Sequence, residues 1–186
     1  MIPFPDKKYS VIYADPPWDY GSRWWRKGSD GKVWKQSVID QYKTMSFKDL
    51  QALPILDIAE NDCMLFMWVI SSMLDKGIEL GLSWGFKYST VGFVWHKDAQ
   101  PVLGTYTHSE CELCLIFKRG KIPQPRGSRK ITQFLKVKRG KHSEKPYQVR
   151  DMISEMFPHH DKIELFARPN WTDYDRGWDF WGNEVS

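Results

Sequence analysis

The chain has 186 residues, of which 41% are hydrophobic and 15% aromatic, which is enough apolar surface to bury one sizeable core. It contains no run of eighteen apolar residues and no charged head followed by a hydrophobic stretch, which excludes a membrane-spanning helix and a visible secretory signal. Three cysteines lie inside apolar runs, an odd number that argues against a disulfide framework and favours a reducing compartment. We therefore expect one cytoplasmic domain over residues 1–186.

The first predicted element is a buried strand, YSVIYAD, which ends at Asp15. A glycine-rich and charged loop follows, about residues 19–45, which is longer than a connection needs and is therefore expected to face the substrate. Basic and aromatic residues are interleaved in it, which suits a nucleic-acid strand whose bases stack on rings while its backbone meets cations. The candidate nucleic-acid contacts in this loop are Arg23, Trp24, Trp25, Arg26 and Lys27.

Helices and strands then alternate along the chain. Ser46 predicts the N-cap of a helix over FKDLQAL that Pro54 closes, and CMLFMWVI predicts a second buried strand. A helix capped by Ser71 or Ser72 is expected next. The remaining predicted elements are strands over 88–97, 110–120 and 161–168 and a helix over 146–157 that starts at Pro146. This alternation predicts an α/β sheet that binds ligands beyond the carboxyl ends of its strands, where Asp15 closes the first strand and Arg168 the last.

A lone CxxC spacing, Cys111 and Cys114, lies within the strand predicted over 110–120. Residues three apart in an extended strand point to opposite faces. The pair is therefore a poor candidate for a shared metal or a redox couple, and we expect no metal site.

The formal net charge of +4 conceals an uneven distribution of charge. Between Lys118 and Lys145 there are eleven Lys or Arg residues and a single acid, Glu144. Because neutralisation of phosphates drives salt-dependent nucleic-acid binding, the loop over about 119–145 predicts a phosphate-bearing partner; a solvated loop is the alternative. Three of its cations are the candidate nucleic-acid contacts: Lys136, Lys138 and Arg139.

The motif that carries the chemistry is Asp15, Pro16, Pro17 and Trp18, directly after the first strand. A carboxylate accepts hydrogen bonds, and prolines add rigidly aimed carbonyls without an N–H beside them. The complement of such acceptors is a planar amine with two hydrogens, whose ring could stack on Trp18. Drawing those hydrogens toward acceptors frees the nitrogen lone pair for attack, which needs orientation and electrostatics more than a strong base. The alternative interpretation is a turn that merely ends a strand.

DPPW after a buried strand resembles the adenine-N6 methyltransferases of the MT-A70 type. The likeness extends over about Tyr9 to Val185. Further motifs follow in the order of that family: LFMWVISSMLDKGIELGLSWGFKY, VGFVWHK, ECELCLIFKRGK with Glu112 as the family glutamate, HSEKPYQVRDMI, DKIELFARP and GWDFWGNEV. Several ordered motifs are more specific than DPPW alone.

The resemblance implies S-adenosylmethionine as cofactor and a Rossmann-like methyltransferase sheet in permuted order, with the catalytic strand first and the cofactor strand last. It implies that Asp15 and the backbone of Pro16 hold the target amine, and that Trp18 stacks on a flipped base. The implied cofactor contacts are Asp15, Lys145, Glu164, Arg168, Asn183 and Glu184. The alternatives are a solvated cation for Lys145, a strand-face charge for Glu164 and a turn residue for Asn183.

The resemblance favours adenine in DNA as the substrate, in the cytoplasm of a bacterial or phage-infected cell, with adenine in RNA as the near alternative. A paired base must leave the stack before its amine can react, and recognition of RNA would need a contact to the 2′-hydroxyl. Cytosine is less favoured, because related cytosine enzymes usually carry Ser where this chain has Asp15. A catalytically silent subunit that binds nucleic acid for an active partner is the alternative from another class, and a homodimer or heterodimer is possible.

Overall fold

The computed structural model describes residues 3–19, 44–98, 106–140, 144–167 and 177–182, and the backbone of 25–27 and 33–35. Its main feature is a seven-stranded sheet in the order β7-β5-β6-β4-β1-β8-β9. The strands are β1 (Tyr9–Ala14), β4 (Ala59–Ile70), β5 (Lys87–His96), β6 (Cys111–Arg119), β7 (Phe134–Lys136), β8 (Lys162–Leu165) and β9 (Trp178–Trp181). β6 is antiparallel to both of its neighbours, whereas the other pairs in the sheet are parallel.

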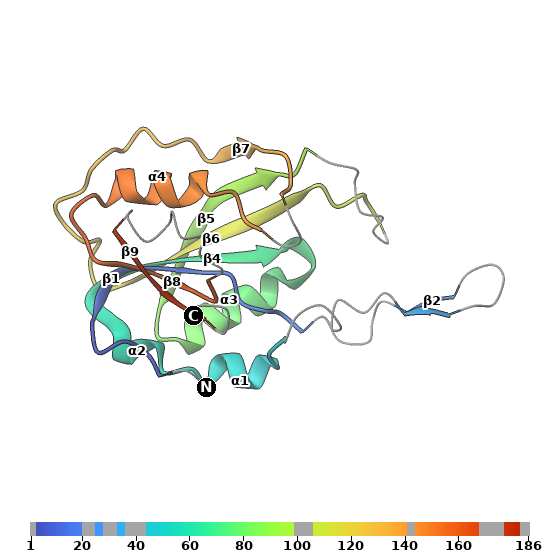
Figure 1. Ribbon diagram of the computed structural model, residues 1–186, viewed down its shortest axis with the longest axis horizontal. Coiled ribbons are helices and arrows are strands. Elements are labelled where there is room, and N and C mark those ends of the chain that lie inside the picture. The colour runs from blue at the N-terminus through green and yellow to red at the C-terminus, as the bar shows by residue number, and fades with distance from the viewer. Residues whose placement is uncertain are drawn as a thin grey trace.

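Helices cover both faces of this sheet (Figure 1). The helices α1 (Phe47–Gln51), α2 (Ile55–Ile58) and α3 (Leu74–Ser83) lie on one face, and α4 (Gln148–Met156) lies on the other. The sheet and its helices confirm the predicted α/β fold and fit the permuted methyltransferase arrangement. No helix in the described part of the chain is long and apolar enough to cross a membrane.

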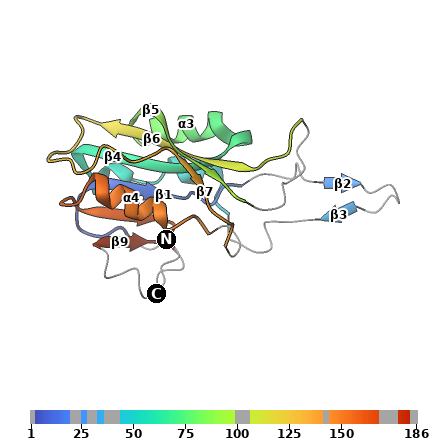
Figure 2. The ribbon, with the colours of Figure 1, turned by 90° about the horizontal axis from the view of Figure 1, so that it is seen from above.

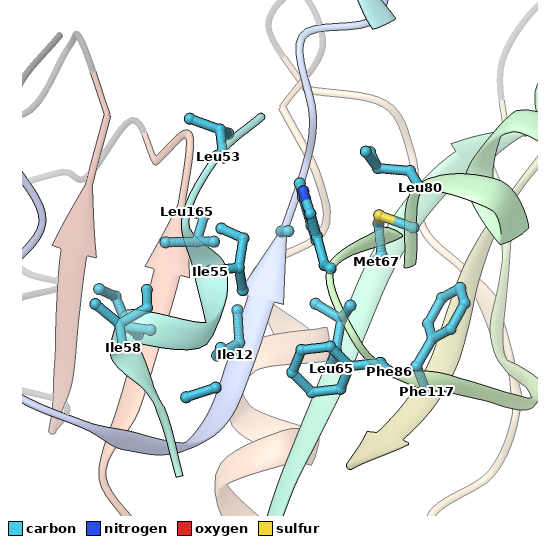
Figure 3. Close-up of a cluster of buried hydrophobic side chains, with 14 of the residues drawn as sticks. Ile12, Leu53, Ile55, Ile58, Leu65, Met67, Leu80, Phe86, Phe117 and Leu165 are labelled. Carbon is cyan, nitrogen blue, oxygen red and sulfur yellow. The ribbon is translucent and has the colours of Figure 1, made fainter. Parts of the chain in front are cut away.

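Two hydrophobic cores form, one on each face of the sheet, because strands that are buried on both sides consist of continuous apolar residues. In β1, Ile12 faces the core under α1, α2 and α3, whereas Val11 faces the core under α4. Figure 3 shows the first of these cores, in which Ile12 and Leu65 from the sheet meet Ile55 from α2. The strand predicted over 63–70 is thus confirmed as the buried part of a longer strand, β4.

Local capping signals were reliable at one helix and not at two others. The predicted cap at Ser46 is confirmed, since its hydroxyl accepts the backbone N–H of Asp49. The predicted cap at Ser71 or Ser72 is wrong: a short 3₁₀ turn, η3 (Ser71–Met73), precedes α3, which begins without a side-chain cap. Pro146 lies one residue before the N-cap of α4, and its carbonyl accepts the N–H of Val149.

The strand predicted over 161–168 is shorter than expected and is not the last in the chain. β8 ends at Leu165, and Phe166 takes a φ of 60°, which lies outside the β region. β9 follows and pairs with β8 in parallel. Runs as short as β7 and β9 carry too few residues for a periodicity to show.

The long loop predicted over 19–45 contains a small hairpin. Its strands, β2 (Trp25–Lys27) and β3 (Val33–Lys35), are antiparallel and form a sheet of their own. Figures 1 and 2 show this hairpin projecting away from the seven-stranded sheet. Of the predicted contacts in this loop, Arg23 and Trp24 lie outside the described residues, and the side chains of Trp25, Arg26 and Lys27 are likewise not described.

Cys111 and Cys114 both lie on the strand β6, as predicted. In a strand, a spacing of three residues places the two side chains on opposite faces. Cys114 is buried in the core under α4, and burial raises the pKa of its thiol well above the usual 9.0. Cys111 is half-buried, and both thiols are free. Within the described ranges, no cluster of His, Cys, Asp or Glu could hold a metal ion.

Candidate active site

The sheet topology brings the ends of several strands to one edge. β1, β4, β5 and β8 are parallel through the sheet, so their carboxyl ends share that edge. β6 runs in the opposite direction and therefore begins there: Glu112, its second residue, pairs with Ile70 at the end of β4 and with Trp95 near the end of β5. Asp15 follows β1 directly, so the two carboxylates arrive at the same edge from strands that are far apart in the sequence.

Hydrogen bonds hold the DPPW motif against its surroundings. The N–H of Asp15 donates to the carbonyl of Leu165 at the end of β8, at 3.5 Å. The carbonyl of Pro17 accepts the N–H of Met45 at 3.0 Å, and the carbonyl of Pro16 accepts the N–H of Trp18 at 2.8 Å. The motif alone suggested that no N–H donor lies beside the Pro16 carbonyl, but in the structure the N–H of Trp18 donates to it. A carbonyl has two lone pairs, so it can still accept a second hydrogen bond from a ligand.

Trp18 does not present an open ring face. Its side chain is 4% exposed and belongs to the core under α1, α2 and α3. Its indole N–H donates to the carbonyl of Trp68 at 3.3 Å, because a buried indole needs a hydrogen-bond partner and the end of β4 offers one. The expectation that Trp18 stacks on a base is not supported by this position; the ring instead anchors the motif to the sheet.

A row of alternating charges lies at this edge. The ammonium of Lys145, just before α4, is 2.7 Å from a carboxylate oxygen of Asp15 and 3.4 Å from one of Glu112. The other oxygen of Glu112 is 2.7 Å from the ammonium of Lys97. The side chains of Lys145 and Glu112 are each 13% exposed. Burial alone would raise the pKa of Glu112, but the ammonium groups of Lys145 and Lys97 outweigh burial and hold this pKa below its usual value of 4.5.

An aromatic layer supports the charges from within the core. The ammonium of Lys145 lies 5.9 Å from the centre of the Trp68 ring, within the range of a cation–π contact. The indole N–H of Trp68 donates to the hydroxyl of Tyr13. Burial raises the pKa of Tyr13 well above 10.0, so this hydroxyl stays neutral. Trp68, Tyr13 and Lys97 were absent from the sequence-based site. Lys97 could have been suspected, because it is the last residue of the strand predicted over 88–97.

The side chains present here have the chemistry to hold S-adenosylmethionine. Lys145 carries an ammonium group that could pair with the amino-acid carboxylate, and Glu164, on β8, carries a carboxylate that could accept hydrogen bonds from ribose hydroxyls. Glu164 is fixed by the guanidinium of Arg150 on α4, at 3.1 Å. The backbone segments that follow β8 and β9 pack closely against each other. A Cβ atom added to Gly182 would lie only 2.9 Å from the backbone nitrogen of Ala167. The other predicted cofactor contacts lie outside the described residues: Arg168, Asn183 and Glu184.

The predicted cations of the basic loop reach the same edge. The N–H groups of Val137 and Arg139 donate to the carbonyls of His96 and Lys97, so the chain continues alongside β5 past its end. Lys136 forms an exposed ion pair with Asp98, at 3.2 Å. All three candidate nucleic-acid contacts in this loop are exposed on this side of the sheet: Lys136, Lys138 and Arg139.

Comparisons with known proteins identify the family of the chain. The chain matches the MT-A70 family model over residues 9–184. It is 48% identical over 190 residues to the Type II methyltransferase M.MunI of Mycoplasma sp, in an alignment that covers 97% of this chain and 79% of that protein. It is 25% identical over 184 residues to the human N(6)-adenosine-methyltransferase catalytic subunit METTL3, covering 96% of this chain and 28% of that protein.

A third relative is the N(6)-adenine-specific methyltransferase METTL4 of mouse, which is 25% identical over 196 residues. That alignment covers 96% of this chain and 38% of METTL4. The chain thus spans most of M.MunI but well under half of either mammalian protein. Because the family model covers nearly the whole chain, this protein belongs to the MT-A70 family of methyltransferases.

Proposed function

We propose that the protein transfers the methyl group of S-adenosylmethionine to the exocyclic N6 amine of adenine in DNA. The observation that carries this proposal is the Asp15 carboxylate beside the Pro16 carbonyl, both fixed at the sheet edge in a chain of the MT-A70 family. The preference for DNA is supported by the relative at 48% identity, whose name, Type II methyltransferase, is consistent with a bacterial restriction–modification enzyme. A cytoplasmic location is the corresponding expectation.

The chemistry requires acceptors for the two amine hydrogens. When bound, S-adenosylmethionine supplies an electrophilic methyl group. The Asp15 carboxylate accepts one N6–H and the Pro16 carbonyl accepts the other, which withdraws the nitrogen lone pair from the ring and directs it outward. The carbonyl is rigid because it belongs to a proline whose neighbours are hydrogen-bonded. Preorganised acceptors of this kind need no rearrangement at the moment of reaction.

Binding of the two ligands is divided between the charged groups of the edge. Lys145 and Glu164 hold the carboxylate and ribose of the cofactor, with Arg168, Asn183 and Glu184 as further expected contacts. Lys136, Lys138 and Arg139 attract the DNA backbone, whose phosphates they neutralise. The target adenine must leave the helix to reach Asp15, so an opened or single-stranded site needs less energy than a paired one.

The first experiment measures transfer of a radiolabelled methyl group to matched DNA and RNA oligonucleotides, each single- and double-stranded, followed by nucleoside analysis. Formation of N6-methyldeoxyadenosine supports the proposal. Formation of N6-methyladenosine from RNA alone would show that RNA, and not DNA, is the substrate. If the cofactor binds but none of the oligonucleotides is labelled, a partner subunit or a specific recognition sequence is missing from the assay. If the cofactor also fails to bind, a catalytically silent subunit that binds nucleic acid becomes the better interpretation of the chain.

Asp15→Ala tests the role of the carboxylate. Transfer should be abolished, because the amine loses its main acceptor, while binding of S-adenosylhomocysteine should remain within about tenfold of wild type. Asp75→Ala is the matched control, since Asp75 is an exposed residue in the first turn of α3. Normal turnover by Asp15→Ala would overturn the proposed mechanism.

A further inference from the structure

Lys97 belongs to the charged row at the sheet edge but to none of the roles assigned above. Four side chains follow one another in this row: Asp15, Lys145, Glu112 and Lys97, joined at 2.7, 3.4 and 2.7 Å. They come from the ends of β1 and β5, the start of β6 and the segment before α4. The side chains of Lys97 and Glu112 are only 15% and 13% exposed, so little solvent screens them.

The charges of the row balance only when Lys97 is present. Two carboxylates then face two ammonium groups. Without Lys97, Lys145 would be the one ammonium group left among these four side chains, and Asp15 and Glu112 would compete for it. In the structure Lys145 is closer to Asp15, at 2.7 Å, than to Glu112, at 3.4 Å, while Lys97 takes the other oxygen of Glu112.

Lys97 is itself held on three sides. Its backbone N–H donates to the carbonyl of Glu110, and its carbonyl accepts the N–H of Arg139. Its ammonium lies 5.9 Å from the centre of the Trp95 ring. A lysine fixed in this way is already in place before any ligand arrives, so it can act on Glu112 at little further entropic cost.

We propose that Lys97 is a positioning residue of the active site: by neutralising Glu112 it leaves the ammonium of Lys145 directed toward Asp15 and the carboxylate of the cofactor. Lys97 acts through Glu112 and touches neither ligand. This proposal rests on the proposed function, because it assumes that Lys145 holds the cofactor. It extends the site from the DPPW motif to a residue on the opposite side of β6.

A double-mutant cycle tests whether Lys97 acts through Glu112. The affinity for S-adenosylhomocysteine is measured by calorimetry in Lys97→Met, Glu112→Gln and the double variant, with Lys76→Met as control. Lys76 pairs with Glu79 on the exposed side of α3, far from the row in the sequence. Lys97→Met should weaken binding about tenfold in the wild-type background, which is a usual size of coupling between contacting charges.

In the Glu112→Gln background, the same replacement of Lys97 should change the affinity by less than about twofold, because no unpaired carboxylate remains to attract Lys145. Lys97→Arg, which keeps the charge, should bind nearly as well as wild type. An equal loss in both backgrounds would mean that Lys97 contacts the ligand or merely supports the fold. Either that result or no loss at all would overturn the proposal.

A second measurement does not depend on the cofactor. The carboxyl group of Glu112 can be titrated by NMR in the ligand-free protein, which also shows that each variant is folded. Its pKa should be higher in Lys97→Met than in wild type and unchanged in Lys76→Met, because Lys97 and Lys145 are the two cations that pair with it. An unchanged pKa in Lys97→Met would overturn the proposal, whereas failure of wild type to bind the cofactor would count against the proposed function alone.

Discussion

Replacing Tyr13 with Phe removes a single oxygen atom from the core beneath the active site. That oxygen accepts the indole N–H of Trp68, and both side chains are almost completely buried. Trp68 in turn lies under the ammonium of Lys145 and accepts the indole N–H of Trp18 through its carbonyl. The Tyr13→Phe variant therefore leaves a buried donor without its partner at a position that supports both the charged row and the DPPW motif.

The expected loss follows from the desolvation of that donor. A buried N–H left without an acceptor costs about 1–3 kcal/mol of stability. A change of this size, taken as about 2 kcal/mol, lowers the melting temperature of a protein of this length by about 4–8 °C. Because the pKa of Tyr13 is raised well above 10.0 by burial, its hydroxyl stays neutral, and the loss should be the same at pH 7 and at about pH 9.

Thermal unfolding followed by calorimetry measures this loss, with urea unfolding as a second estimate. Tyr88→Phe is the matched control, because Tyr88 is 39% exposed on β5 and its replacement should alter stability by less than about 0.5 kcal/mol. Equal melting temperatures for the two variants would refute the reasoning, since they would show that the Trp68 N–H does not depend on Tyr13.

Three further predictions follow from the described residues. The exposed cations of the basic loop to be neutralised are Lys136, Lys138 and Arg139. Their replacement should weaken DNA binding and reduce the slope of log affinity against log salt by up to about 3. An unchanged slope would show that these three residues do not contact the DNA. Glu112→Gln should destabilise the protein most at neutral pH. The folded-state pKa of Glu112 is lowered, so its contribution to stability is present above about 4.5 and is lost as the pH falls through the lower folded value; urea midpoints that differ equally at all pH values would contradict this. Gly81→Ala should cost about 1–3 kcal/mol in the same assay, because a Cβ at Gly81 would overlap the ring of Phe117, and a stability equal to wild type would show that α3 shifts without cost.

Several features were predictable because they depend on neighbouring residues. The continuous apolar runs that form β1 and the buried part of β4 predicted strands covered on both faces, and the structure confirms them. The hydroxyl of Ser46 predicted a helix start, since an N-cap is a contact within one turn. DPPW at the end of the first strand, together with the resemblance of the later motifs, located the site at the carboxyl edge of the sheet.

Other predictions failed where a local signal met a tertiary competitor. Ser71 and Ser72 were expected to cap a helix, but the chain enters α3 through a 3₁₀ turn. Stacking of Trp18 on a base stays a prediction, and in the structure its indole N–H donates to the carbonyl of Trp68 while its ring packs into the core. The last strand was expected to end at Arg168, but β8 stops at Leu165 and β9 follows.

The sequence by itself determined the long buried strands and the chemistry of the DPPW motif, because each depends on residues adjacent in the chain. It also determined the family, through motifs that follow one another in a fixed order. Only the tertiary structure brought Glu112 and Lys97 into the site. β6 had to insert antiparallel between β4 and β5 for its first residues to reach the edge occupied by Asp15. Periodicity describes which face of a strand is buried but not which strand lies beside it. Pairing between distant strands is decided by packing of the whole sheet, and so the charged row that completes the site could be found only in the folded protein.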